Sequence, residues 1–155
     1  MPEQADYELM ALIKRLATLL YQNIDQALKP YDLARTQYGV LHNLRESGSL
    51  PTGELVAKLQ IEPATVSGLI DTLEAKGLVA RIEHPADKRR KDVRLTAEGQ
   101  RLIDGIPPLG PSLEEVLRQD IDDNDVYILR AVGRQMVANL EKQLRKQEGV
   151  APSVR

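Results

Sequence analysis

The chain has 155 residues and a formal net charge of −2, from 21 basic and 23 acidic side chains. This length suits about one domain. It contains no cysteine, which excludes disulfides, thiolate zinc sites and thiol-based redox sensing. The N-terminal stretch is acidic, and no later stretch approaches the roughly 20 apolar residues that a membrane span requires. We therefore expect a cytoplasmic protein with no membrane partner.

Basic side chains are concentrated in one short segment. Residues 81–101 hold 7 basic and 4 acidic side chains, whereas residues 1–80 hold 7 and 10 and residues 102–155 hold 7 and 9. Attraction to phosphates depends on the local patch of charge rather than on the net charge. The acidic average is therefore compatible with DNA binding through this segment.

Apolar periodicity predicts two helices in the first third of the chain. Leu and Ile recur at helical spacing over residues 6–29, and Pro30 closes this first helix. Thr36 is the predicted N-cap of the second helix, and Gly48 ends it.

Two short helices joined by a tight turn are predicted next. The first stops after Gln60, and Pro63 suits the first position of the second, which ends at Gly77. A turn of about three residues between two helices is the spacing of a helix-turn-helix.

A β-hairpin is predicted directly after Gly77. Residues 78–82 and 93–95 alternate in hydropathy as strands do, and they flank the segment H-P-A-D-K-R-R-K-D. We interpret that segment as a long basic loop. The predicted fold class is therefore mainly α with a small β-hairpin wing, and residues 33–100 form a winged helix-turn-helix lobe.

The C-terminal third is predicted to be helical with a bend. Thr96 caps a helix, and the glycines and prolines of residues 105–111 must interrupt or kink it before Leu113 resumes. The last helix opens at the acidic residues 122–125 and extends to about Lys146. The tail has no periodicity and is predicted to fray. The long apolar stripes of the first and last helices favour a two-fold homodimer.

The hairpin motif resembles the MarR family of winged helix-turn-helix transcriptional regulators. The family pattern D-P-x-D-x-R followed by V-x-L-T-x-x-G corresponds here to H-P-A-D-K-R and V-R-L-T-A-E-G within residues 84–99. Residues 63–79 resemble the family's recognition helix and its exit into the wing. The resemblance implies one chain of this type over residues 1–155, with a DNA-binding lobe at 33–100, dimerisation helices at 1–32 and 101–148, and a tail at 149–155 that is disordered.

The function implied by this resemblance is sequence-specific regulation of transcription. A homodimer would bind a pseudo-palindromic operator on double-stranded DNA, most often as a repressor, and a small-molecule effector would release it. The DNA-binding residues expected from the motif and the charge pattern are Pro63, Ala64, Thr65, Ser67, Gly68, Arg81, Asp87, Lys88, Arg89, Arg90, Lys91 and Arg94.

Three features bear on the DNA-binding prediction. Arg89 matches the arginine that relatives insert into the minor groove, and Asp87 would orient it. Many relatives also place arginine at the positions of Gly68 or Thr72, so its absence here shifts the expected specificity towards shape and apolar contact. His84 replaces the family's usual aspartate, and we favour an exposed turn residue over a phosphate contact.

The resemblance also implies an effector site between the dimer helices and the DNA-binding lobe, for small aromatic or phenolic anions. Arg15 could pair with a carboxylate, and Tyr38 and His42, one helical turn apart, could line a semi-polar cleft. A satisfied core residue is the stronger interpretation of each side chain taken singly.

Other functional classes find less support in the sequence. It shows no nucleophile with a base, no phosphate-cradling glycine loop and no metal-ligand spacing, so we expect neither an enzyme nor a cofactor. The rival interpretation is a winged-helix protein-interaction module without DNA binding. The arginine-rich wing discriminates against it, because such a module does not need one.

Overall fold

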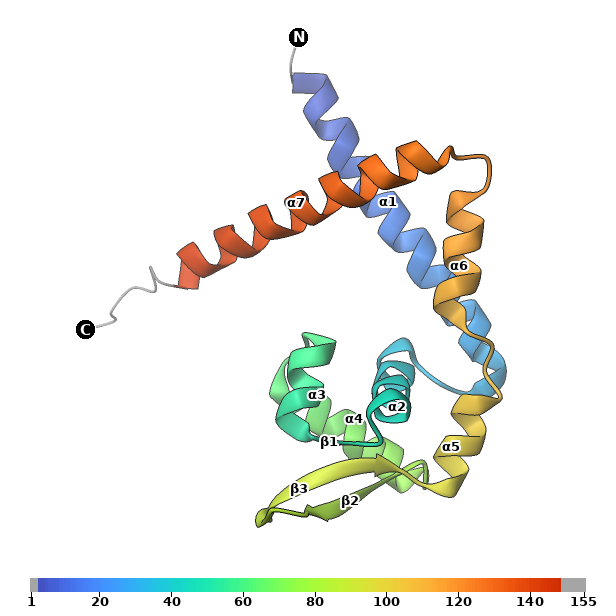
Figure 1. Cartoon of the computed structure of the whole chain (residues 1–155), viewed down its shortest axis with the longest axis vertical. Coiled ribbons are helices and arrows are strands. Elements are labelled where there is room, and N and C mark those ends of the chain that lie inside the picture. Colours follow the sequence, from blue (N-terminus) through green and yellow to red (C-terminus); the bar gives the residue numbers. More distant parts are fainter. Residues whose placement is uncertain (1–2, 149–155) are drawn as a thin grey trace, which may run out of the picture. The chain divides into compact units, whose positions relative to one another are not determined.

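The computed structural model describes residues 3–148, so the predicted disorder of residues 149–155 concerns residues outside the described part. The chain is mainly helical with one small antiparallel sheet, as predicted from the sequence (Figure 1). It divides into two compact units, one ending at Leu109 and the other beginning at Gly110. The elements in chain order are α1 (Glu3–Leu28), the 3-10 helix η1 (Lys29–Tyr31), α2 (Arg35–Ser47), β1 (Ser49–Pro51), α3 (Thr52–Leu59), α4 (Pro63–Ala75), β2 (Val79–His84), β3 (Asp87–Leu95), α5 (Ala97–Asp104), α6 (Leu109–Arg118) and α7 (Asp123–Glu148).

Helices α3 and α4 form the predicted helix-turn-helix. Helix α3 ends at Leu59, and the backbone of the next residue, Gln60, adopts the left-handed conformation with φ of 54°. Pro63 occupies the start of α4, where its missing N–H costs nothing. Gly77 follows α4 with φ of 72°, a conformation that suits glycine.

The predicted cap of α2 is wrong. Helix α2 already begins at Arg35, so Thr36 lies inside its first turn. The backbone N–H of Ala34 donates to Oε1 of Gln37 at 3.0 Å. The glutamine therefore reaches back to the start of the helix, and a hydroxyl cap at Thr36 is not used.

The sheet has three strands in the order β1-β3-β2. Val93 at its centre pairs with Leu50 of β1 on one side and with Arg81 of β2 on the other. Sequence analysis did not anticipate β1. A strand of three residues is too short to show alternation, and its partner β3 lies more than 35 residues further along the chain.

The long basic loop predicted for the wing is wrong. Strand β2 continues to His84 and β3 begins at Asp87, so only Pro85 and Ala86 form the turn. The register shifts at the tip: Glu83 pairs with Lys91, while the next residue, His84, pairs with Asp87. Residues 88–90 lie between those two pairings, so the basic residues sit on an irregular stretch of β3.

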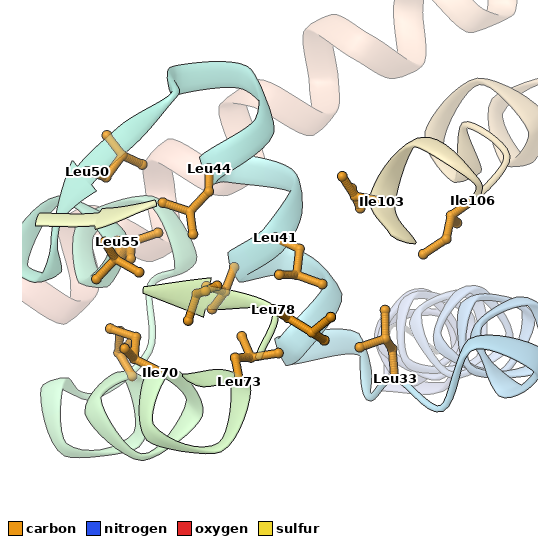
Figure 2. Packing of buried hydrophobic residues seen from close by; sticks show 14 of the residues in the cluster. Leu33, Leu41, Leu44, Leu50, Leu55, Ile70, Leu73, Leu78, Ile103 and Ile106 are labelled. Atoms are coloured by element: carbon orange, nitrogen blue, oxygen red, sulfur yellow. The ribbon is translucent and has the colours of Figure 1, made fainter. Parts of the chain in front are cut away.

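One apolar core holds the first unit together. Leu41, Leu55 and Ile70 from α2, α3 and α4 are fully buried in it, and Figure 2 shows them in the same cluster as Ile103. Burying a side chain of this size contributes about 1.5–3 kcal/mol. The core includes Leu28, Ile103, Ile106 and Leu109, so it extends beyond residues 33–100, whose assignment as the DNA-binding part stays a prediction. This packing fixes α4 relative to the sheet.

The second unit consists of α7 and most of α6. The predicted break after α5 is present, but the helix resumes at Leu109 rather than at Leu113, because Gly110 and Pro111 fit within the first turn of α6. Helix α7 opens at the predicted acidic cluster, where Oδ1 of Asp122 accepts from the backbone N–H of Asn124 at 2.8 Å. In residues 3–148, no helix is long and apolar enough to cross a membrane.

Candidate nucleic-acid interface

Helix α4 has one buried face and one exposed face. Val66, Ile70 and Leu73 are fully buried against the core. The five residues of α4 predicted to touch DNA are all exposed: Pro63, Ala64, Thr65, Ser67 and Gly68. The core therefore holds the helix so that these residues face outward.

The hydroxyls on this face differ in availability. Thr72 Oγ1 donates to the backbone carbonyl of Gly68 at 2.9 Å, so its proton is already used. The side-chain hydroxyls of Thr65 and Ser67 form no hydrogen bond with another described residue. Their hydroxyls are available to base edges or phosphates.

Arg81 of β2 binds helix α4. Its guanidinium contacts Oδ1 of Asp71 at 2.5 Å and the carboxylate of Glu74, while its backbone N–H donates to Oε1 of Glu74 at 3.2 Å. The hydrogen bond that Arg81 donates to Asp71 is the main cause of the raised pKa of Arg81; burial opposes it, and Glu74 raises the pKa further. The sequence predicted a DNA contact here, and the structure places the side chain as a link between α4 and the wing.

The turn of the wing is fixed by two short-range hydrogen bonds. Asp87 Oδ1 accepts from the backbone N–H of Arg89 at 3.0 Å, so it holds the arginine's backbone. His84 Nδ1 accepts from the backbone N–H of Ala86 at 3.1 Å. The histidine is only 25% exposed, so it is a half-buried residue that braces the turn rather than an exposed one.

The cations of the wing lie on β3. Arg89, Arg90, Lys91 and Arg94 are exposed on this strand. Lys88 also belongs to β3, but its side chain lies outside the described part. Exposed guanidinium and ammonium groups along one strand are suited to phosphate oxygens or a narrow minor groove.

Thr96 and Gly99 join the wing to the end of α4. Thr96 Oγ1 donates to the carbonyl of Gly77 at 2.6 Å and accepts from the N–H of Gly99 at 3.0 Å. A Cβ at Gly99 would lie 1.9 Å from the carbonyl oxygen of Leu78. The T-x-x-G part of the motif therefore holds the wing to the end of α4, and its last position accepts only glycine.

Asp92 is a buried charge that sequence analysis missed. Its side chain is 6% exposed, and Oδ2 lies 4.0 Å from Nε2 of His84. Oδ1 has no hydrogen-bond partner among the described residues. An aspartate that follows a run of charged wing residues gives no sequence signal of burial, because such a run is usually exposed to solvent.

The predicted effector residues are only partly brought together. The rings of Tyr38 and His42 stack, with centroids 5.7 Å apart and planes 17° from parallel. Burial raises the pKa of Tyr38, an effect that nearby Arg45 opposes, so the phenol is neutral at physiological pH. Arg15 is exposed on α1, as is His42 on α2. A missed pair links these two helices: the Arg35 guanidinium lies 4.1 Å from the centre of the Tyr21 ring.

The fold and the interface define a winged helix-turn-helix DNA-binding protein. The MarR family model matches residues 33–91, which include α2, α3, α4 and the tip of the wing. The HTH-type transcriptional regulator YhbI of Bacillus subtilis is 30% identical over 107 residues, covering 69% of this chain and 70% of YhbI. The chain therefore belongs to the MarR family and is a transcriptional regulator, not an enzyme.

Two further similarities bear on function. The transcriptional repressor MdtR of Bacillus subtilis is 31% identical over 96 residues, which span 59% of this chain and 62% of MdtR. A structure of BpsR from Bordetella bronchiseptica, whose DNA binding is regulated by 6-hydroxynicotinic acid, matches with a TM-score of 0.71 and 26% identity, covering 82% of this chain and 91% of BpsR.

Proposed function

We propose that the protein is a homodimeric repressor that binds a pseudo-palindromic operator and is released from it by a small aromatic anion. The observation that carries the DNA-binding part is the joint exposure of the α4 face and of the β3 cations on one compact unit. In this proposal α4 enters the major groove and the wing contacts the neighbouring minor groove. The contacting residues are Pro63, Ala64, Thr65, Ser67, Gly68, Asp87, Lys88, Arg89, Arg90, Lys91 and Arg94, with Arg81 positioning the wing.

The dimer is supported by apolar side chains that the single chain leaves in solvent. On α1, Leu12 is 64% exposed, and on α7, Leu129 and Leu140 are 65% and 67% exposed. Large exposed apolar surfaces mark interaction sites, and a second copy would cover the same surfaces reciprocally. The half-sites of the operator would then lie about one helical turn apart, roughly 34 Å.

Repression and effector release are supported by the relatives. MdtR is a repressor, and the DNA binding of BpsR responds to an aromatic acid. The stacked rings of Tyr38 and His42 offer a flat surface for an aromatic ligand, and Arg15 offers a charge for its carboxylate. As a regulator of genomic DNA, the protein would work in the bacterial cytoplasm.

Selection of bound duplexes from a random pool tests the proposal. We expect an enriched inverted repeat, bound by a species with twice the mass of the chain. Affinity for it should fall steeply with salt, because each phosphate contact releases counterions. Arg89→Ala should weaken binding to all sequences and reduce the salt slope by about one contact. No enrichment and no duplex affinity would instead favour a protein-interaction module.

A further inference from the structure

The recognition helix carries none of the side chains that usually read purines. Its 13 residues, P-A-T-V-S-G-L-I-D-T-L-E-A, include no Arg, Lys, Asn, Gln or His. Guanine is read most often by Arg or Lys at O6 and N7, and adenine by Asn or Gln at N6 and N7. Neither pairing is available from α4.

The two carboxylates of α4 already form ion pairs within the protein. Asp or Glu can accept a hydrogen bond from the N4 amino group of cytosine. Here Asp71 and Glu74 are both held by the guanidinium of Arg81. This pairing occupies both carboxylates, so neither is free to accept from cytosine, and the positive guanidinium offsets part of a negative charge that would otherwise repel phosphates.

The groups that remain on the outer face are methyl groups, a proline ring and hydroxyls. Ala64 and Thr65 are exposed in the first turn of α4, next to Pro63. One turn further, Gly68 has nothing within 4 Å of the position a Cβ would take. The backbone can therefore approach the floor of the groove closely, which brings the methyl groups of Ala64 and Thr65 to the base edges.

The geometry points to thymine as the base that α4 reads, through contact of its C5-methyl group with Ala64 and Thr65. The C5-methyl is the one apolar group that a base pair presents in the major groove. This inference rests on the proposed function and adds a specificity to it: T·A pairs lie under the first turn of α4 in each half-site. Thr65 and Ala64 are the residues that determine it.

Replacing thymine by deoxyuridine tests the inference directly, because the exchange removes only the methyl group and keeps the base pairing. Duplexes are selected from a random pool with the full-length protein, and the enriched sequence is resynthesised with deoxyuridine at single positions. We expect T·A pairs under α4, and about a fourfold loss of affinity for each contacted methyl, which corresponds to about 0.8 kcal/mol. Deoxyuridine under the wing should have no effect, because the methyl group lies in the major groove.

Two variants of Thr65 separate its methyl from its hydroxyl. Thr65→Ser removes the methyl, so its affinity should drop about fourfold for the thymine duplex and stay unchanged for the deoxyuridine duplex. Thr65→Val keeps a methyl and removes the hydroxyl, so it should retain discrimination between the two duplexes. The residue is exposed, so both variants should fold, which the circular dichroism spectrum and melting temperature verify.

The outcomes distinguish this inference from the proposed function. Salt-dependent binding of the selected duplex with equal affinity for thymine and deoxyuridine would overturn the thymine inference alone. G·C pairs under α4 would overturn it as well. They include a cytosine preference that is lost in Glu62→Gln, since Glu62 is the exposed residue directly before α4. Absence of binding to any duplex would overturn both.

Discussion

Arg81 on the first wing strand and Asp71 on the recognition helix are joined by an ion pair of 2.5 Å. Glu74, one helical turn from Asp71, binds the other arm of the same guanidinium. The planar guanidinium of Arg81 binds both carboxylates of α4 at once. It therefore fixes both the distance and the relative rotation of α4 and β2. The angle between α4 and the wing is therefore set by a side chain that the charge pattern alone assigned to DNA.

Arg81→Ala should weaken DNA binding through geometry rather than through a lost phosphate contact. Exposed ion pairs contribute little to stability, about 0.2–1 kcal/mol each, so the melting temperature should change only slightly. Affinity should fall for all duplexes while the slope of log affinity against log salt stays the same. Faster amide hydrogen exchange in β2 and β3 would report the loosened wing.

Arg101→Ala is the matched control for Arg81→Ala. Arg101 forms a comparable pair with Glu98 on α5, but both partners are well exposed and belong to one helix. This variant should leave DNA affinity and wing exchange unchanged. If Arg81→Ala instead reduced the salt slope by about one, Arg81 would be a phosphate contact.

Gly99→Ala should be strongly destabilising. The added methyl would lie 1.9 Å from the Leu78 carbonyl oxygen, a backbone atom that cannot move aside without disturbing the joint at Thr96. We expect the free energy of unfolding to drop by about 3 kcal/mol, at the upper end for overpacking. Chemical denaturation of the purified protein measures this.

Gly53→Ala provides the comparison for Gly99→Ala. Gly53 lies in helix α3, and a Cβ there would meet nothing within 4 Å. Alanine is the better helix former by about 0.5–1 kcal/mol, so this variant should be neutral or slightly more stable. Equal destabilisation by the two substitutions would contradict the steric explanation.

The features that sequence analysis predicted correctly are those encoded by local signals. Pro63, Gly77 and Thr96 act within one helical turn of their own position, and each marks the helix boundary that it predicted. The strand conformation of the wing tip was harder to predict, because Lys88–Lys91 are charged residues with low strand propensity. Their place on a strand follows from the pairing of Asp87 and Lys91, on either side of residues 88–90, with β2, and local propensity does not describe such a contact between segments.

The roles of polar side chains at the site depend on the fold in the same way. Seven to ten residues separate Arg81 from its two partners, across the end of a helix and a turn. Charge counting placed Arg81 with the other wing cations, but only the packing of β2 beside α4 shows where its guanidinium points. The residues of α4 itself were assigned to the exposed face correctly, because helical periodicity alone separates them from Val66 and Ile70.

Asp92→Leu should stabilise the protein. The carboxylate is buried next to His84, and its Oδ1 has no partner among the described residues. A buried polar group without a hydrogen bond costs about 1–3 kcal/mol in proteins, and apolar replacement of buried charges is often stabilising. We expect the free energy of unfolding at pH 7 to rise by about 1–2 kcal/mol.

The comparison variant for Asp92→Leu is His84→Asn. It removes the imidazole 4.0 Å from Asp92 and should destabilise the protein by about 1 kcal/mol, because it weakens the brace of the turn. Combining both substitutions should restore most of that loss. A lower stability of Asp92→Leu alone would mean that the carboxylate has a favourable partner, such as an ordered water molecule.

Substitutions in the stacked pair on α2 should separate effector response from DNA binding. With 6-hydroxynicotinic acid as the probe, release of the selected duplex can be followed by fluorescence anisotropy. His42→Ala removes one of the two rings on which the ligand would stack, and an aromatic contact is worth about 0.5–1.5 kcal/mol, so half-release should need about five times more ligand. Tyr38→Phe keeps the stack and should shift half-release less, unless the phenol donates a hydrogen bond to the ligand.

Both variants should bind the duplex normally without the probe, because neither side chain lies on α4 or the wing. An unchanged half-release concentration for His42→Ala would remove this residue from the effector site.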